Sequence, residues 1–126
     1  VAKFHKALAG GVRPTIFGGG TNTRDYIYVG DIAQANMIEM KEGTKTGAKK
    51  GASVTVNISA AKETSDETLF NVIAKAMMKT AITPIQKPFR AGDIKRSALT
   101  NTRAKKLIGW KPTTTLTEGI RKTISS

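Results

Sequence analysis

The sequence contains no cysteine and one histidine, His5, among its 126 residues. The absence of cysteine excludes disulfide bonds and thiolate metal ligands. A single imidazole offers no pair of ligands for a histidine-based zinc site and does not favour a serine–histidine nucleophile pair. We therefore expect neither a metal site nor nucleophilic catalysis of that kind.

Long hydrophobic runs are also missing. No window approaches the ~18 consecutive apolar residues that a membrane-spanning helix requires. Residues 1–6 have no apolar core of the length of a secretory signal. Hydrophobic residues make up 39% of the chain and charged residues 24%, as in soluble globular proteins. We expect one cytoplasmic domain that does not enter a membrane.

Two short motifs combine an arginine, an aspartate and an aromatic residue. The first, within residues 23–31, contains Arg24, Asp25 and Tyr26, and the second, residues 88–93, contains Arg90 with Phe89 and Asp93. A guanidinium group presents planar, paired donors that suit phosphate oxygens. The motifs therefore indicate a site for a phosphorylated ligand that carries a ring. A plain ion pair between neighbouring residues is the structural alternative.

Lysine and arginine outnumber aspartate and glutamate by 21 to 9, so the formal net charge is +12. This excess raises the expectation of polyanionic partners, since phosphate contacts dominate nucleic-acid affinity. Four lysines fall in residues 41–52, which we expect to be a flexible basic loop. No basic run alternates with aromatic residues, as a groove for single strands requires. A nucleic-acid partner is possible but less favoured than a solvated basic surface.

Hydrophobic periodicity and capping residues predict a mixed chain of class α/β, or α+β in isolation. The expected helices cover residues 1–9, 31–42, 66–77, 102–108 and 116–124. The expected strands cover residues 13–17, 25–29, 53–58 and 82–86.

Several local features refine these elements. Asp31 is expected as the N-cap of the second helix, which is apolar on most of its circumference and so needs neighbours on two sides. Residues 64–67 are expected to form a capping box, and Asn101 and Thr115 to cap the last two helices. Residues 18–20, three glycines, fit a flexible hairpin turn better than a phosphate loop, because the lysine and serine or threonine of a P-loop are missing.

Five ordered motifs together resemble a known family. They occupy residues 21–35, 56–58, 62–65, 88–93 and 104–112. In this order they resemble the C-terminal, substrate-binding half of extended short-chain dehydrogenases/reductases, and most closely that of the UDP-glucose 4-epimerases. The resemblance covers essentially the whole chain and implies a single substrate-binding domain, residues 1–126, from which the N-terminal Rossmann half is missing.

The resemblance implies a UDP-sugar as ligand and gives roles to particular residues. Arg24 and Arg90 match the arginines that hold the diphosphate, and Asp93 matches the aspartate that helps hold the ribose. The strand containing Thr15 and Phe17 matches the one beside uracil, with Phe17 as stacking residue or pocket wall. An ordinary core role for Phe17 stays open. Tyr26 would support the residues that contact the ligand.

The resemblance also implies that the catalytic and cofactor-binding motifs of the family lie outside this chain. In the family, a glycine-rich NAD fingerprint and a catalytic Tyr-x-x-x-Lys pair lie upstream. Here Tyr26 is followed four residues later by Gly30, and Tyr28 by Ile32. No G-x-G-x-x-G occurs either. The chain alone is therefore expected to lack a catalytic residue and a cofactor site, with NAD implied only for the complete family enzyme.

Asp66 departs from the family pattern, because an apolar residue is common at this position near the nucleotide. A carboxylate there would oppose a diphosphate, but Asp in a first helical turn also favours the helix dipole, and we favour this benign role.

Partners follow from the apolar helix at 31–42 and the strand near 54–58, which in the family complete the nucleotide-binding sheet. We expect a homo-oligomer or a separate N-terminal half to cover them. Two other functions stay open: a basic module that binds nucleic acid or another polyanion, and a ligand-free assembly fragment derived from an epimerase.

Overall fold

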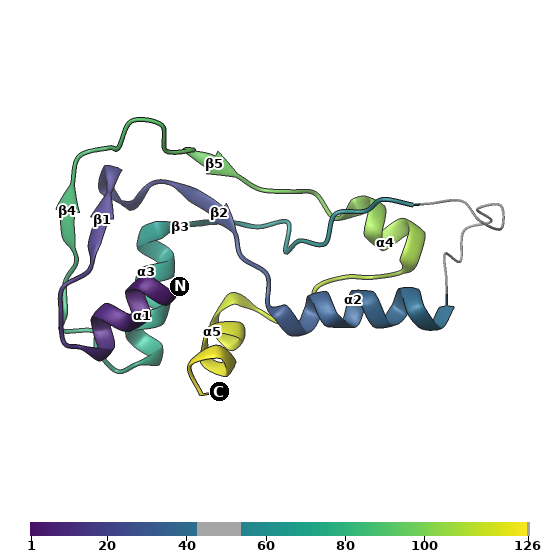
Figure 1. Cartoon of the computed structure of the whole chain (residues 1–126), viewed down its shortest axis with the longest axis horizontal. Coiled ribbons are helices and arrows are strands. Elements are labelled where there is room, and N and C mark those ends of the chain that lie inside the picture. Colours follow the sequence, from purple (N-terminus) through teal and green to yellow (C-terminus); the bar gives the residue numbers. More distant parts are fainter. Residues whose placement is uncertain (43–53, 126) are drawn as a thin grey trace.

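A computed structural model describes residues 1–42 and 54–125, so the predicted basic loop lies almost entirely outside the described residues. The chain is mixed α/β, as expected (Figure 1). Its helices are α1 (Ala2–Ala9), α2 (Val29–Glu42), α3 (Asp66–Ala76), α4 (Thr102–Ile108) and α5 (Leu116–Ile124). Its strands are β1 (Thr15–Phe17), β2 (Thr23–Asp25), β3 (Glu63–Ser65), β4 (Ile85–Lys87) and β5 (Arg96–Ser97), and a 3-10 turn spans Gly18–Gly20.

The strands form two small sheets. β1 pairs in parallel with β4, so that Ile16 lies opposite Gln86. The second sheet has the order β3-β2-β5, with β3 antiparallel and β5 parallel to the central strand. No strand of either sheet exceeds three residues, and most of the burial therefore comes from helices.

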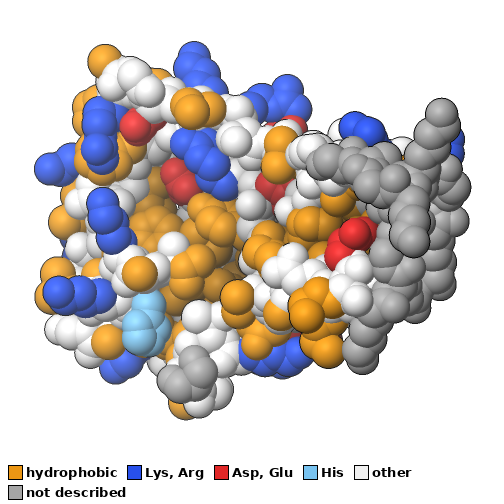
Figure 2. All heavy atoms as spheres, turned by 45° about the vertical axis from the view of Figure 1, so that its right-hand side comes forward, with side chains coloured by type: hydrophobic (Ala, Val, Ile, Leu, Met, Phe, Trp, Pro, Cys, Tyr) orange, Lys and Arg blue, Asp and Glu red, His pale blue; other side chains and the backbone are white. Residues whose placement is uncertain are grey.

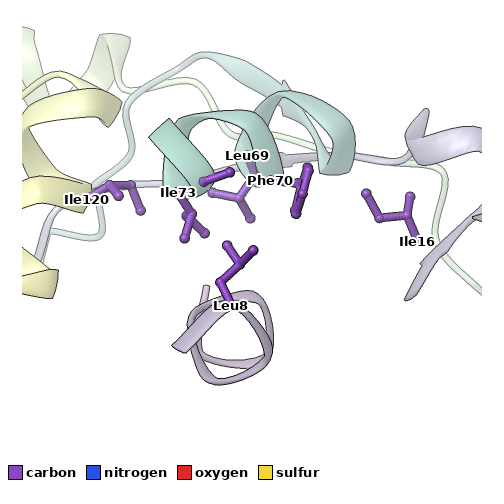
Figure 3. Packing of buried hydrophobic residues seen from close by; sticks show 7 residues of the cluster. Leu8, Ile16, Leu69, Phe70, Ile73 and Ile120 are labelled. Atoms are coloured by element: carbon purple, nitrogen blue, oxygen red, sulfur yellow. The ribbon is translucent and has the colours of Figure 1, made fainter. Parts of the chain in front are cut away.

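Helices α1, α3 and α5 and the β1–β4 sheet form a core lobe (Figure 1). Leu8 of α1 points at α3, where Leu69 and Ile73 face it, while Ile120 of α5 closes one side and Ile16 of β1 the other (Figure 3). All five side chains are buried. The amphipathic spacing within each helix produces this single apolar centre.

Helices α2 and α4 extend to one side and form the α2–α4 lobe (Figure 1). Its buried cluster has four members: Ala35, Ala104, Ile108 and Trp110. The indole Nε1–H donates to the carbonyl oxygen of Asp31 at 3.0 Å, so the buried indole is satisfied. Trp110 is the largest of the four buried side chains in this lobe.

Two expected strands are wrong in part. Residues 54–58 are not a strand in the described structure, although Val56 and Ile58 pack against the α2–α4 cluster. A strand requires a hydrogen-bonding neighbour, and no described segment pairs with this one. The strand expected at 25–29 is instead β2, and the chain turns into α2 already at Val29.

Asp31 is not the N-cap of α2, because it lies within the first turn. Its carboxylate accepts hydrogen bonds from Thr113 Oγ1 at 2.7 Å and from the Thr114 backbone N–H at 3.0 Å. Burial acts to raise the pKa of Asp31, but these hydrogen bonds outweigh it and lower the pKa. Asp31 thereby ties α2 to the segment that precedes α5.

Helix starts follow the local sequence at α3 and α5, and less closely at α4. Thr115 and Glu118 form the expected capping box of α5. Ser65, not Thr64, caps α3, and it accepts from the Thr68 N–H at 3.1 Å. Asn101 precedes α4 as expected, but its side chain donates to Ser59 O and does not cap the helix.

The three glycines at 18–20 are not a hairpin turn. They form a 3-10 turn in which every φ is positive, and the strands on either side belong to different sheets. Within the described ranges, no helix has the length and apolar character needed to cross a bilayer.

Candidate functional site

A pocket of about 650 Å³ lies in the core lobe. Its walls are α1, residues 14–17 around β1, Tyr26 after β2, the first turn of α3 and Arg90. On the face seen in Figure 2, hydrophobic side chains gather in a hollowed middle region, with lysine and arginine side chains spread around the margin. The pocket therefore offers an apolar wall with charged groups at its edge, as expected of a small-molecule site.

Arg90 and Phe17 form one wall together. The guanidinium carbon lies 4.2 Å from the centre of the phenyl ring, which is a cation–π contact. Arg90 Nε also approaches Asp93 Oδ2 at 4.0 Å, and 59% of the arginine side chain is exposed. The ring and the carboxylate thus orient a guanidinium group that stays open to solvent.

The glycine turn makes room beside this wall. A Cβ at Gly18 would lie 2.6 Å from the ring of Phe89, and Gly18 has a φ of +58°. Only glycine fits both the close approach and the positive φ. Lys95 Nζ lies 5.3 Å from the centre of the same ring. The residues that lead into Arg90 are therefore packed against the turn after β1.

Asp66 lies in the first turn of α3, where a favourable interaction with the helix dipole was expected, and it also lines the pocket. Burial is the main cause that raises the pKa of its carboxyl, Arg24 opposes the rise, and Asp93 adds to it. Burial also raises the pKa of Tyr26, helped by Asp66 and opposed by Arg24. These groups therefore act on one another across the pocket.

Arg24 and Asp25 do not form the ion pair considered as an alternative. Arg24 Nη1 donates to the Thr23 carbonyl oxygen at 2.7 Å. Asp25 accepts from the backbone N–H groups of Ala60 and Ala61 at 3.0 and 3.1 Å. Asp25 thus positions a neighbouring segment, while Arg24 is half-buried and acts on the pocket through its charge.

Four of the six residues expected at the site line the pocket: Thr15, Phe17, Tyr26 and Arg90. The other two, Arg24 and Asp93, lie outside its lining but shift the pKa of Asp66. Lys3 of α1 lines the pocket and was missed. A basic residue at the polar edge of an amphipathic helix carries no local signal that distinguishes it from an ordinary solvated lysine.

The described residues do not fit a dinucleotide cofactor. The dinucleotide fingerprint needs a strand, a glycine turn and then a helix whose N-terminus meets the pyrophosphate. Here the glycine turn after β1 continues into β2 and no helix begins there. Three His, Cys, Asp or Glu side chains grouped to hold a metal ion are likewise not found in the described ranges.

A protein-family model matches nearly the whole chain. The model of the GDP-mannose 4,6 dehydratase family matches residues 1–123. The chain belongs to this family, and its fold matches the C-terminal portion of extended short-chain epimerases and dehydratases.

Individual relatives agree with this assignment. The chain is 39% identical over 124 residues to the UDP-glucose 4-epimerase of Mycolicibacterium smegmatis, covering 98% of this chain and 37% of that protein. It is 38% identical over 112 residues to a putative UDP-glucose 4-epimerase of Methanocaldococcus jannaschii, covering 89% and 33%. The chain thus spans little more than a third of the length of these relatives.

Solved structures of epimerases are also similar to this chain in fold. A UDP-glucose 4-epimerase from Thermotoga maritima, solved with UDP-glucose, has a TM-score of 0.79 and 32% identity, over 97% of this chain and 37% of that one. A UDP-N-acetylglucosamine 4-epimerase from Methanobrevibacter ruminantium, in complex with UDP-N-acetylmuramic acid, has a TM-score of 0.81 and 28% identity, over 98% and 37%. A Thermus thermophilus UDP-glucose 4-epimerase, solved with NAD, has a TM-score of 0.74 and 26% identity, over 98% and 38%.

Proposed function

We propose that this chain is the nucleotide-sugar-binding part of a UDP-sugar epimerase. In this proposal the core-lobe pocket holds the nucleotide, and the chain alone binds without turnover. Catalysis in the complete family enzyme would need NAD and an acid/base pair, for which this chain supplies neither a glycine fingerprint nor a Tyr-x-x-x-Lys.

One observation carries the proposal: Arg90 and Phe17 meet at 4.2 Å on the wall of a pocket of about 650 Å³. The pair combines an anion-binding group with an aromatic face, and UDP combines a diphosphate with a base. Thr15 and Tyr26 line the same pocket and add polar groups beside its apolar surface. The UDP-sugar epimerases among the relatives supply the ligand class.

Arg24 and Asp93 complete the proposed site. Arg24 is close enough to Asp66 to oppose the rise in the pKa of that carboxyl, so its charge reaches the pocket. We assign it to the diphosphate, together with Arg90. Asp93 approaches Arg90 Nε at 4.0 Å and is only partly exposed. It would accept from a ribose hydroxyl while it holds the guanidinium group in place.

Calorimetric titration of the chain with UDP, UDP-glucose and a DNA oligomer at two salt concentrations tests this proposal. We expect uridine-selective binding, and we expect Arg90→Ala to abolish it because the ligand loses its main anion-binding group. Arg103→Ala, on α4 in the other lobe, is the matched control and should bind normally.

The DNA titration separates the alternative functions. Binding to DNA with a steep salt dependence and no base preference would favour the polyanion-binding function that the +12 charge suggests. No binding of any ligand would leave an assembly function. Unchanged affinity of Arg90→Ala for UDP would contradict the site proposed here.

A further inference from the structure

Asp66 is the one carboxylate among the described residues that line the pocket. It is the first residue of α3, and its backbone N–H donates to the Asn22 carbonyl oxygen at 2.9 Å. This bond fixes the start of the helix against the segment before β2. The half-buried carboxylate is therefore held on the pocket wall that also carries Tyr26 and Arg90.

Several charged or titratable groups surround this carboxylate. They are Lys3 of α1, Arg24 and Tyr26 in and after β2, and Arg90 with Asp93 in the segment before β5. Glu67, the next residue of α3, is exposed and does not line the pocket. The two arginines oppose two aspartates. Because the two carboxylates offset part of the positive charge, a diphosphate entering the pocket meets less attraction than Lys3 and the two arginines alone would supply.

We propose that Asp66 sets the charge selectivity of the pocket. Its carboxylate weakens the binding of a diphosphate and leaves the binding of an uncharged nucleoside unchanged. This inference rests on the proposed function and adds to it a residue that tunes affinity for the anionic part of the ligand.

Protonation of Asp66 removes the repulsion. A bound diphosphate favours the protonated carboxyl, so binding takes up a proton, and affinity rises as the pH falls from neutral toward the raised pKa of Asp66. UDP-glucose is the suitable probe, because both of its phosphates are esterified and keep their charge across this range. The terminal phosphate of UDP itself titrates at a pKa of about 6 and would obscure the effect.

The test compares wild type, Asp66→Asn and Glu67→Gln at about pH 8 and about pH 5, with constant salt. Glu67→Gln is the control, since it removes an exposed carboxylate from the same turn of α3. One pKa unit of coupling corresponds to a tenfold change in affinity, so we expect Asp66→Asn to bind UDP-glucose about tenfold more tightly at the higher pH. Uridine affinity, measured by NMR shift titration, should not change.

The pH series gives a second readout. Wild type and Glu67→Gln should gain affinity for UDP-glucose as the pH falls, whereas Asp66→Asn should show no such gain. Asp66→Ser provides a second uncharged variant if the amide disturbs the start of α3. Equal affinity and equal pH dependence in wild type and both Asp66 variants would overturn this inference and leave the proposed function standing.

Weaker binding of UDP-glucose by both Asp66 variants would also overturn it, because the carboxylate would then be a hydrogen-bond acceptor for the ligand. Failure of every form of the protein to bind UDP-glucose would overturn the proposed function, and this inference with it.

Discussion

The core lobe and the α2–α4 lobe differ in how completely each one buries its own apolar side chains. The core lobe surrounds its apolar centre with three helices and a pair of strands. The α2–α4 lobe buries four apolar residues and leaves large apolar side chains exposed on α2: Val29 (69%), Ile32 (37%), Met37 (52%) and Met40 (86%).

This difference is consistent with a proposed binding site in the core lobe and a predicted docking surface on the α2–α4 lobe. The pocket lies against the better-packed lobe, so its walls are held by contacts within the chain. The exposed apolar side chains of α2, together with the unpaired segment 54–58, leave surface that a partner could cover. That a homo-oligomer or a separate N-terminal half covers this surface stays a prediction.

The largest effect should come from Trp110→Ala. Trp110 is 1% exposed and is the largest side chain of the small cluster, so its truncation should cost about 3–5 kcal/mol of unfolding free energy in that lobe. Hydrogen exchange should show amides of α2 and α4 losing protection while those of α1 and α3 keep it. Trp110→Phe, which retains a ring, should lose less. Equal loss of protection in both lobes would contradict the separation between them.

A smaller effect is expected from Asp31→Asn, which weakens the link between the lobes. Hydrogen bonds to a charged group contribute about 1.5–3 kcal/mol, so urea unfolding near neutral pH should show a loss of this order. Because the folded pKa of Asp31 is lowered, its stabilisation is complete above the unfolded value and disappears as the pH falls through the folded one.

The difference in unfolding free energy between wild type and Asp31→Asn should therefore shrink in acid. Glu39→Gln, an exposed carboxylate on α2, is the control and should change stability little at any pH. A difference that stays constant with pH would mean that the charge of Asp31 does not stabilise the fold.

The smallest effect on stability should come from Met37→Lys with Met40→Lys. Both side chains are exposed, so the free energy of unfolding should change by no more than about 0.5 kcal/mol. Self-association in size-exclusion chromatography and binding of a hydrophobic dye should both fall. Met78→Lys is the control, since Met78 is 90% exposed but follows α3 in the core lobe. A wild-type monomer that binds no dye would contradict the docking surface.

Sequence predicted the features that depend on neighbouring residues. The helix of α5 follows from Thr115 and Glu118 three residues apart, and its capping box is confirmed. Asp31 was misjudged because its partners Thr113 and Thr114 lie 82 and 83 positions away. Residues 54–58 have the composition of a strand, but strand formation depends on a neighbour that no local pattern specifies.

At the candidate site, too, the sequence predicted some features and left others to the packing of the chain. The second arginine motif indicated Arg90 and the family resemblance indicated Phe17, and the structure brings the two into contact. The pocket position of Asp66 depends on how α3 packs against α1 and the glycine turn after β1. The sequence alone favoured the dipole role and did not show that Asp66 lines a pocket. Its effect on ligand binding stays a prediction.

The most direct test of the account is amide hydrogen exchange of the chain with and without UDP-glucose. We predict slower exchange in α1, in β1, at the start of α3 and in residues 88–93, with no change in α2 and α4. Protection in the α2–α4 lobe, or no protection around the pocket at saturating ligand, would contradict the claim that the core lobe binds the nucleotide.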